Sequence, residues 1–228
     1  MDMGRVLKDI IWITIIIAVL CIGITVFDDR KYLFVSMFIA LVSCFMVYSA
    51  YERKSGGIRR MVIISVMVAM AVAGRCIFAP VPGFKPVTAI VVITAIYLGS
   101  EAGFITGSLT ALISDMFFGA GPWTPFQMCA LGLIGMIAGI PYMKNLLKNR
   151  VWLILYGVLA GALYSAIMDI WTVLSIDGTF NITRYWAAVI TSIPFILIYS
   201  ISDVVFLVIL IKPIGKKLER INKKHCIF

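Results

Sequence analysis

Long apolar stretches separated by short polar or Pro/Gly-rich breaks make up most of this chain. Several approach or exceed the about 20 residues that a helix needs to cross the hydrocarbon core of a bilayer. The pattern predicts an all-α polytopic membrane protein with eight membrane-spanning segments, at residues 10–27, 32–50, 61–79, 87–99, 102–118, 126–142, 151–174 and 185–211. Only Ser100 and Glu101 separate the fourth segment from the fifth, so these two short segments should form a tight helical hairpin.

The positions of the basic residues predict how the chain is threaded. With a cytoplasmic N-terminus, eight spans place fifteen of the twenty Lys and Arg residues in the cytoplasmic segments, as the positive-inside rule requires. Both termini are therefore expected in the cytoplasm. Because topology accounts for the net charge of +9, nucleic acid is not needed as a partner.

A polar linker at residues 51–60 (YERKSGGIRR) divides the chain. Residues 1–58 are predicted to form an N-terminal transmembrane hairpin with its cytoplasmic linker. The remainder, 59–228, is predicted to be a six-helix substrate-binding core. The first span is flanked by Asp28-Asp29-Arg30-Lys31 and not by a small-residue cleavage site, so we expect a retained helix and not a signal peptide.

The composition excludes several classes of protein. Residues are 62% hydrophobic and 14% charged, against roughly a quarter charged in a soluble domain. In 228 residues with eight spans there is no room for a nucleotide-binding domain, and no G-x-x-x-x-G-K-[ST] motif occurs. The single histidine, His225, lies near the C-terminus, and the five cysteines are scattered. We therefore expect no metal, no disulfide and no enzymatic activity.

Four ionisable residues lie within the apolar segments: Arg75, Asp115, Asp169 and Asp203. Charges inside a membrane are costly and so suggest function by default. Counted along their spans, Arg75, Asp115 and Asp169 share one layer near the outer boundary, where they could form a structural ion pair, a ligand pocket, or both. Asp203 falls in the cytoplasmic half, where we expect a role in helix packing or partner contact.

The connection at residues 117–128 (FFGAGPWTPFQM) carries a helix-start signal. Thr124 is a suitable N-cap, Pro125 suits the first helical position, and Gln127 would complete a Thr-x-x-Gln capping box. The free N–H groups of that helix would face the outer vestibule behind Trp123. A well-capped helix with an interfacial Trp explains the segment by itself, but its proximity to Asp115 favours a ligand site.

Two further features frame the predicted pocket. The connection at residues 79–86 (APVPGFKP) holds three prolines and presents Phe84 and Lys85, so it is predicted to be an outer lid or, more simply, a rigid turn. In the span before it, small residues recur every four positions, at Ser65, Ala69 and Ala73. This stripe permits close approach of another helix and points nearly opposite to Arg75.

These motifs resemble the substrate-binding S components of energy-coupling factor (ECF) vitamin transporters. The resemblance rests on the A-x-x-x-A pattern at Ala69 and Ala73, on residues 75–86 (RCIFAPVPGFKP) and on residues 117–128. It covers the six-span core and not the N-terminal hairpin. The GPWTPFQM variant within the last motif suggests the corrinoid-linked branch, with cobalamin or a corrinoid precursor as ligand.

The resemblance implies a binding subunit in the bacterial plasma membrane that captures a vitamin from outside and topples in the bilayer to deliver it. Ala69, Ala73 and the neighbouring Ser65 would pack on an ECF transmembrane scaffold driven by two ABC-type ATPases. ATP would be used by those partners, and this chain would bind no cofactor. The substrate-binding residues would be Arg75, Phe84, Lys85, Asp115, Trp123, Thr124, Gln127 and Asp169. The alternative is a stand-alone, ion-coupled secondary transporter of a small organic solute.

Overall fold

The computed structural model describes residues 57–177 and 180–225, and this part of the chain is all helical. Its helices are α3 (Gly57–Ile77), α4 (Val87–Leu98), α5 (Ser100–Phe118), α6 (Thr124–Ala138), α7 (Pro141–Leu146), α8 (Arg150–Asp177) and α9 (Ile182–His225). The two predicted spans at 10–27 and 32–50 lie outside the described residues. The six predicted core spans correspond to α3, α4, α5, α6, α8 and α9, and the all-α prediction is confirmed.

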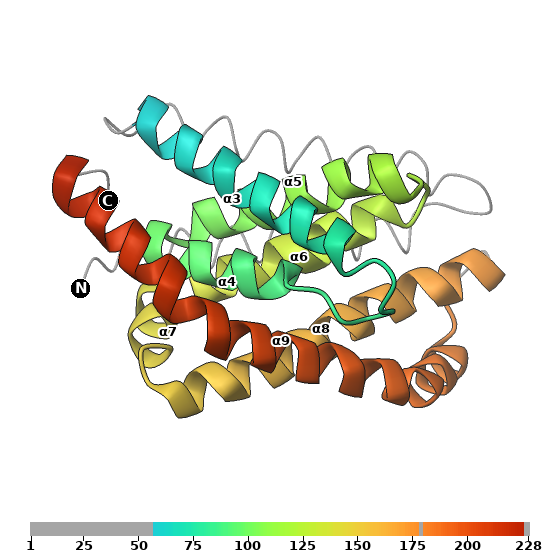
Figure 1. The fold of residues 1–228 in the computed structure, drawn as a ribbon. Coiled ribbons are helices and arrows are strands. Elements are labelled where there is room, and N and C mark those ends of the chain that lie inside the picture. Colours follow the sequence, from blue (N-terminus) through green and yellow to red (C-terminus); the bar gives the residue numbers. More distant parts are fainter. Residues whose placement is uncertain (1–56, 178–179, 226–228) are drawn as a thin grey trace.

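Helix α4 lies at the centre of the bundle (Figure 1). It contacts α3, α5, α6, α7 and α9, and every residue in it except Tyr97 is buried. Its sequence, VTAIVVITAIYL, is apolar on all sides, as expected for a helix enclosed by other helices. At 12 residues α4 is too short to span a bilayer alone, whereas α3, α8 and α9 are long and apolar enough to do so.

Glycines allow the closest helix contacts. A β-carbon on Gly103 of α5 would overlap the backbone of Gly135 in α6, and one on Gly107 would overlap Leu131. A β-carbon on Gly161 of α8 would likewise overlap the backbone of Ser200 in α9. The Gly-x-x-x-Gly spacings in the sequence therefore serve internal packing.

The hairpin predicted between the fourth and fifth spans is present. Gly99 alone separates α4 from α5, with φ +98°, a conformation that favours glycine. The Arg60 guanidinium donates a hydrogen bond to the carbonyl of Leu98 at 2.7 Å, so a cation from α3 satisfies an open carbonyl at the end of α4.

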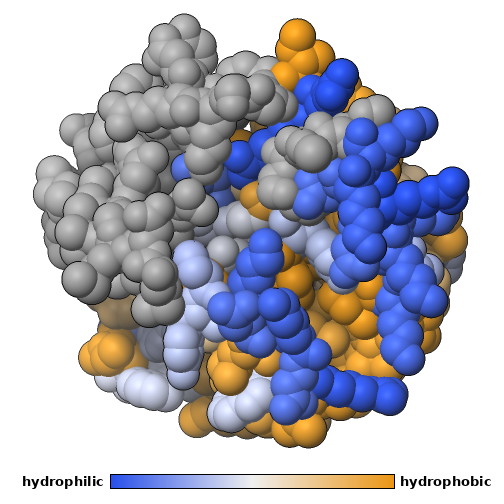
Figure 2. Space-filling model, turned by 90° about the vertical axis from the view of Figure 1, so that its left-hand side faces the viewer, coloured by the Kyte–Doolittle hydropathy of each residue, from blue (hydrophilic) through white to orange (hydrophobic). Residues whose placement is uncertain are grey.

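The two ends of the bundle differ in polarity. We call the end that holds the start of α3 and the last turns of α9 the basic end. Viewed onto this end, hydrophilic side chains gather over the described surface, with hydrophobic side chains on the flanks (Figure 2). Helix α9 accounts for much of this, since its 44 residues extend well past the predicted end at 211 and carry Lys216, Lys217, Arg220, Lys223 and Lys224. The opposite end holds the α3–α4 and α5–α6 connections, and we call it the pocket end.

Candidate ligand site

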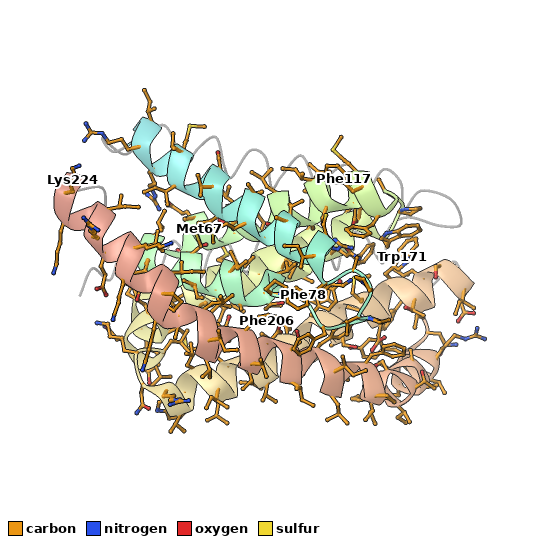
Figure 3. All side chains as sticks on the ribbon, in the orientation of Figure 1. Met67, Phe78, Phe117, Trp171, Phe206 and Lys224 are labelled. Atoms are coloured by element: carbon orange, nitrogen blue, oxygen red, sulfur yellow. The ribbon has the colours of Figure 1, made fainter. Side chains whose placement is uncertain are left out.

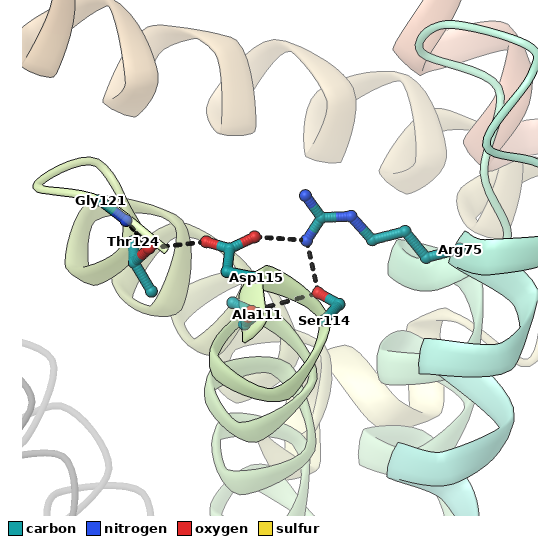
Figure 4. A network of polar contacts seen from close by, with 6 residues as sticks. All are labelled: Arg75, Ala111, Ser114, Asp115, Gly121 and Thr124. Carbon is teal, nitrogen blue, oxygen red and sulfur yellow. Dashed lines mark hydrogen bonds and ion pairs between the residues drawn. The ribbon is translucent and has the colours of Figure 1, made fainter. Parts of the chain in front are cut away.

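An ion pair joins α3 to α5 at the pocket end. Arg75 Nη1 lies 2.9 Å from Asp115 Oδ1, and the same nitrogen donates a hydrogen bond to Ser114 (Figure 4). The Asp115 side chain is 1% exposed and that of Arg75 is 13% exposed. The Arg75 guanidinium also lies 5.2 Å from the centre of the Phe118 ring, within cation–π range. The structure thus brings together two of the predicted residues as a buried, hydrogen-bonded pair.

The α5–α6 connection is fastened to the same carboxylate. Thr124 Oγ1 donates to Asp115 Oδ2 at 2.8 Å and accepts from the N–H of Gly121 at 3.1 Å (Figure 4). With its amide nitrogen facing Asp115, the Gln127 side chain donates to both carboxylate oxygens at 3.2 Å. Asp115 therefore organises α3, α5 and α6 at one point, which leaves little of its hydrogen-bonding capacity for a ligand.

The predicted capping box is wrong. Helix α6 begins at Thr124, its N-cap is Trp123, and no side chain caps it. Thr124 and Gln127 have the residue types of a capping box, but both side chains turn to Asp115 instead. A helix N-terminus calls for hydrogen-bond acceptors, whereas the buried carboxylate of Asp115 calls for donors. Thr124 and Gln127 act as donors to Asp115, and the sequence pattern does not reveal this use.

The α3–α4 connection turns back into the bundle, so that α4 begins well inside it (Figure 1). Ser202 of α9 holds this connection through the backbone of Lys85: its Oγ accepts from the Lys85 N–H at 2.8 Å and donates to the Lys85 carbonyl at 3.1 Å. Phe78, Phe84 and Phe206 form an aromatic cluster beside it, with ring centres 4.9 to 6.0 Å apart; Phe78 and Phe206 are labelled in Figure 3.

A cavity of about 160 Å³ lies behind this connection, and we call it the inner cavity. A second cavity of about 480 Å³, the outer cavity, lies between α8 and α9. Both are lined by Gln127, Tyr164 and Tyr199, so the two are neighbours that share walls. The rings of the two tyrosines meet edge to face, 5.4 Å apart. The pair of cavities thus offers aromatic surfaces with a few polar groups, a composition typical of small-molecule sites.

The predicted site residues divide between these cavities and their supports. Arg75, Lys85 and Gln127 line the inner cavity, and Gln127 and Asp169 line the outer one. The sequence placed Asp169 in one layer with Arg75 and Asp115, but Asp169 does not join that ion pair. It accepts a hydrogen bond from Ser192 of α9 at 2.7 Å.

The other predicted residues lie outside both cavities. Phe84 packs in the apolar core, Thr124 supports Asp115, and Trp123 is 38% exposed at the surface. The proline-rich connection packs onto α9 through Phe84, which contacts Phe206, while Lys85 of the same connection lines the inner cavity.

The placement of Asp203 in a separate layer of the bundle is wrong. Asp203 lines the inner cavity together with Arg75 and Lys85 and is 3% exposed. Counting residues along each span assumes that every helix begins at the membrane boundary. The α3–α4 connection breaks that assumption because it carries Lys85 and the first turn of α4 inward to meet α9.

Sequence reasoning also missed Tyr164, Tyr199, Thr88 and Ser202 as site residues. A tyrosine or serine in an apolar helix is ambiguous in sequence, since it can face lipid, a neighbouring helix or a cavity. Only the approach of α4, α8 and α9 decides between these. Within the described residues, no three His, Cys, Asp or Glu side chains are placed to hold a metal ion.

The small-residue stripe lies away from the cavities. Ser65, Ala69 and Ala73 are exposed along one face of α3, while Met67 and Ala71 of the same helix are buried. The exposed face is therefore open to another helix, and Arg75 lies on the side that packs against α5.

Fold and site together define a multi-pass helical membrane protein with a small-molecule cavity at one end. The model of the family described as ECF-type riboflavin transporter, S component, matches residues 55–220. The match covers well over half of the chain, and the protein belongs to this family of transporter subunits. The comparisons with curated proteins and with solved structures gave no match.

Proposed function

We propose that this protein is the substrate-binding subunit of an ECF-type importer and that its ligand is riboflavin or a closely related flavin. The observation that carries the proposal is the meeting of two cavities at Gln127, Tyr164 and Tyr199 in a chain of a family described by riboflavin transport. A flavin combines a flat heteroaromatic ring with a hydroxylated chain, so it needs an aromatic-walled space continuous with a polar one.

The polarity of the two cavities suits such a ligand. The inner cavity holds the ionisable side chains of Arg75, Lys85 and Asp203, which can hydrogen-bond with the polar edge of a ring. The outer cavity carries hydroxyl-bearing and acidic side chains, which suit a polyol: Ser165, Asp169, Thr172, Thr191 and Ser192.

The size of the cavities favours a flavin over a corrinoid. Taken together, the two cavities of about 160 and 480 Å³ fall in the range for a ligand of ordinary drug size, roughly 300–1,000 Å³, although the inner cavity alone is smaller than that range. A corrinoid, with its macrocycle and nucleotide arm, would need the helices to move apart. Cobalamin nevertheless remains the second ligand to test, since the GPWTPFQM motif suggested it.

In this proposal the protein supplies binding, and energy comes from partners. The pocket end faces outward and the basic end faces the cytoplasm, as the positive-inside rule favours. The exposed face at Ser65, Ala69 and Ala73 packs on the transmembrane scaffold, which two ABC-type ATPases drive. The subunit topples to carry its ligand inward.

The test uses the full chain purified in lipid nanodiscs, titrated with riboflavin and separately with cobalamin. We expect saturable quenching of flavin fluorescence without ATP, and uptake into liposomes only when the scaffold and ATPases are present. Cobalamin binding without riboflavin binding would overturn the ligand assignment. Uptake by this chain alone that collapses with an ionophore would instead establish a secondary transporter.

A further inference from the structure

Asp203 is a buried carboxyl group that lines the inner cavity and has few protein partners. It is 3% exposed, and the one side chain hydrogen-bonded to it among the described residues is Thr88, in the first turn of α4. A carboxylate has about four acceptor positions, and burying one without partners costs free energy. The open positions therefore call for a donor from whatever fills the inner cavity, which Asp203 lines.

Asp115 shows that a buried carboxylate in this bundle can be fully paired, so the small number of partners is particular to the site of Asp203. Asp115 receives Arg75, Thr124 and Gln127, so the fold satisfies it completely. Asp203 lines the same cavity as Arg75 yet has no basic side chain within salt-bridge distance in the described chain.

Lys85 supplies the complementary group. Its backbone is fixed on both sides by Ser202, the residue that precedes Asp203, and its side chain lines the inner cavity. No ion pair joins Lys85 to a carboxylate of the described residues. The inner cavity thus presents an ammonium donor and a carboxyl acceptor. The Lys85 backbone is anchored at Ser202, next to Asp203 in the chain, and no ion pair joins the two side chains.

We propose that Asp203 determines ligand specificity by accepting a hydrogen bond from a ring N–H of the ligand, while Lys85 donates to the carbonyl next to that N–H. The chemical class this pair selects is a planar heterocycle with a lactam or imide edge, packed against Tyr164 and Tyr199. A carboxyl oxygen accepts from N–H in either protonation state. This proposal rests on the flavin ligand proposed above, whose imide edge has this arrangement of donor and acceptors.

The test compares riboflavin with 3-methylriboflavin, which lacks the imide N–H, by fluorescence titration of the full chain in nanodiscs. The wild-type protein should bind the methylated ligand about 10- to 100-fold more weakly, because the hydrogen bond is lost and a buried acceptor is left without its donor. In Asp203→Ala this discrimination should fall to within a few-fold, with weaker riboflavin binding. Asp203→Asn, which keeps an accepting oxygen, should retain much of it.

Asp169→Asn is the matched control, because Asp169 is the other buried carboxylate with a single serine or threonine partner. Because Asp169 lines only the outer cavity, Asp169→Asn should change the affinity for both ligands by the same factor, so the ratio of the two affinities should equal that of the wild type. Equal binding of both ligands by the wild type, or full discrimination in Asp203→Ala, would overturn the assignment of Asp203 and leave the flavin ligand standing. Absence of riboflavin binding to the wild type would overturn both proposals.

Discussion

Arg75 of α3 and Asp115 of α5 form a buried ion pair, 2.9 Å between Nη1 and Oδ1, at the point where the α5–α6 connection is also attached. The pair therefore has two consequences. It ties three helices together at the pocket end, and it directs the remaining guanidinium surface of Arg75 toward the inner cavity.

Removing one member of this pair should destabilise the protein more than removing both. Asp115→Ala leaves the Arg75 charge unpaired in a buried site, at a cost of about 3–5 kcal/mol. The double variant Arg75→Met with Asp115→Leu should recover much of that loss. Apparent melting temperatures in one detergent would measure this, and equal melting of the single and double variants would contradict the prediction.

Ser202→Ala should loosen the α3–α4 connection. The change removes both hydrogen bonds to the Lys85 backbone, each worth about 1 kcal/mol. We expect ligand to dissociate about tenfold faster, measured by stopped-flow recovery of flavin fluorescence.

Ser200→Ala is the control for that experiment. Ser200 lies on the same helix and donates to the Val158 carbonyl of α8, not to the connection. Its loss should leave the dissociation rate unchanged. Equal acceleration by both variants would mean that the effect comes from α9 as a whole.

Gly107→Ala should separate α5 from α6. A β-carbon at this position would overlap the backbone around Leu131, and backbone cannot rotate away as a side chain can. We expect a loss of about 1–3 kcal/mol, typical of overpacking, seen as a lower melting temperature. Gly157→Ala should be better tolerated, because its nearest neighbours are side-chain atoms of Val204 and Leu207 at 3.0 and 3.1 Å.

Ala69→Trp should weaken assembly with the transporter scaffold without affecting the cavity. Ala69 is exposed on α3, on the face away from the bundle, and a large side chain there would prevent close helix approach. Co-purification with the scaffold should fall while riboflavin affinity stays constant. Leu159→Trp, at another exposed apolar position, is the control, and undiminished assembly of Ala69→Trp would count against this interface.

The sequence was most informative where a residue's role depends on its own chemistry or on its neighbours in the chain. The apolar segments predicted every long helix of the described core, and the break at Ser100 and Glu101 predicted the α4–α5 hairpin, which the structure turns at Gly99. The cost of charge inside a membrane identified Arg75 and Asp115 as important from the sequence alone. The predictions failed at Thr124 and Asp203, where the outcome depends on which groups from other helices lie nearby.

By itself, the sequence determined that this is a helical membrane protein with a basic end and a small set of costly buried charges. The free energy of placing a side chain in lipid depends mainly on that side chain, so apolar spans and buried charges can be recognised from the sequence. Only the tertiary structure decided how those charges are used. The α3–α4 connection lies inward against Ser202, so Lys85 lines the same cavity as Asp203, which is 118 positions further along the chain. Whether these two residues line one cavity depends on how α4, α8 and α9 pack together, which the pattern of apolar and polar residues does not reveal.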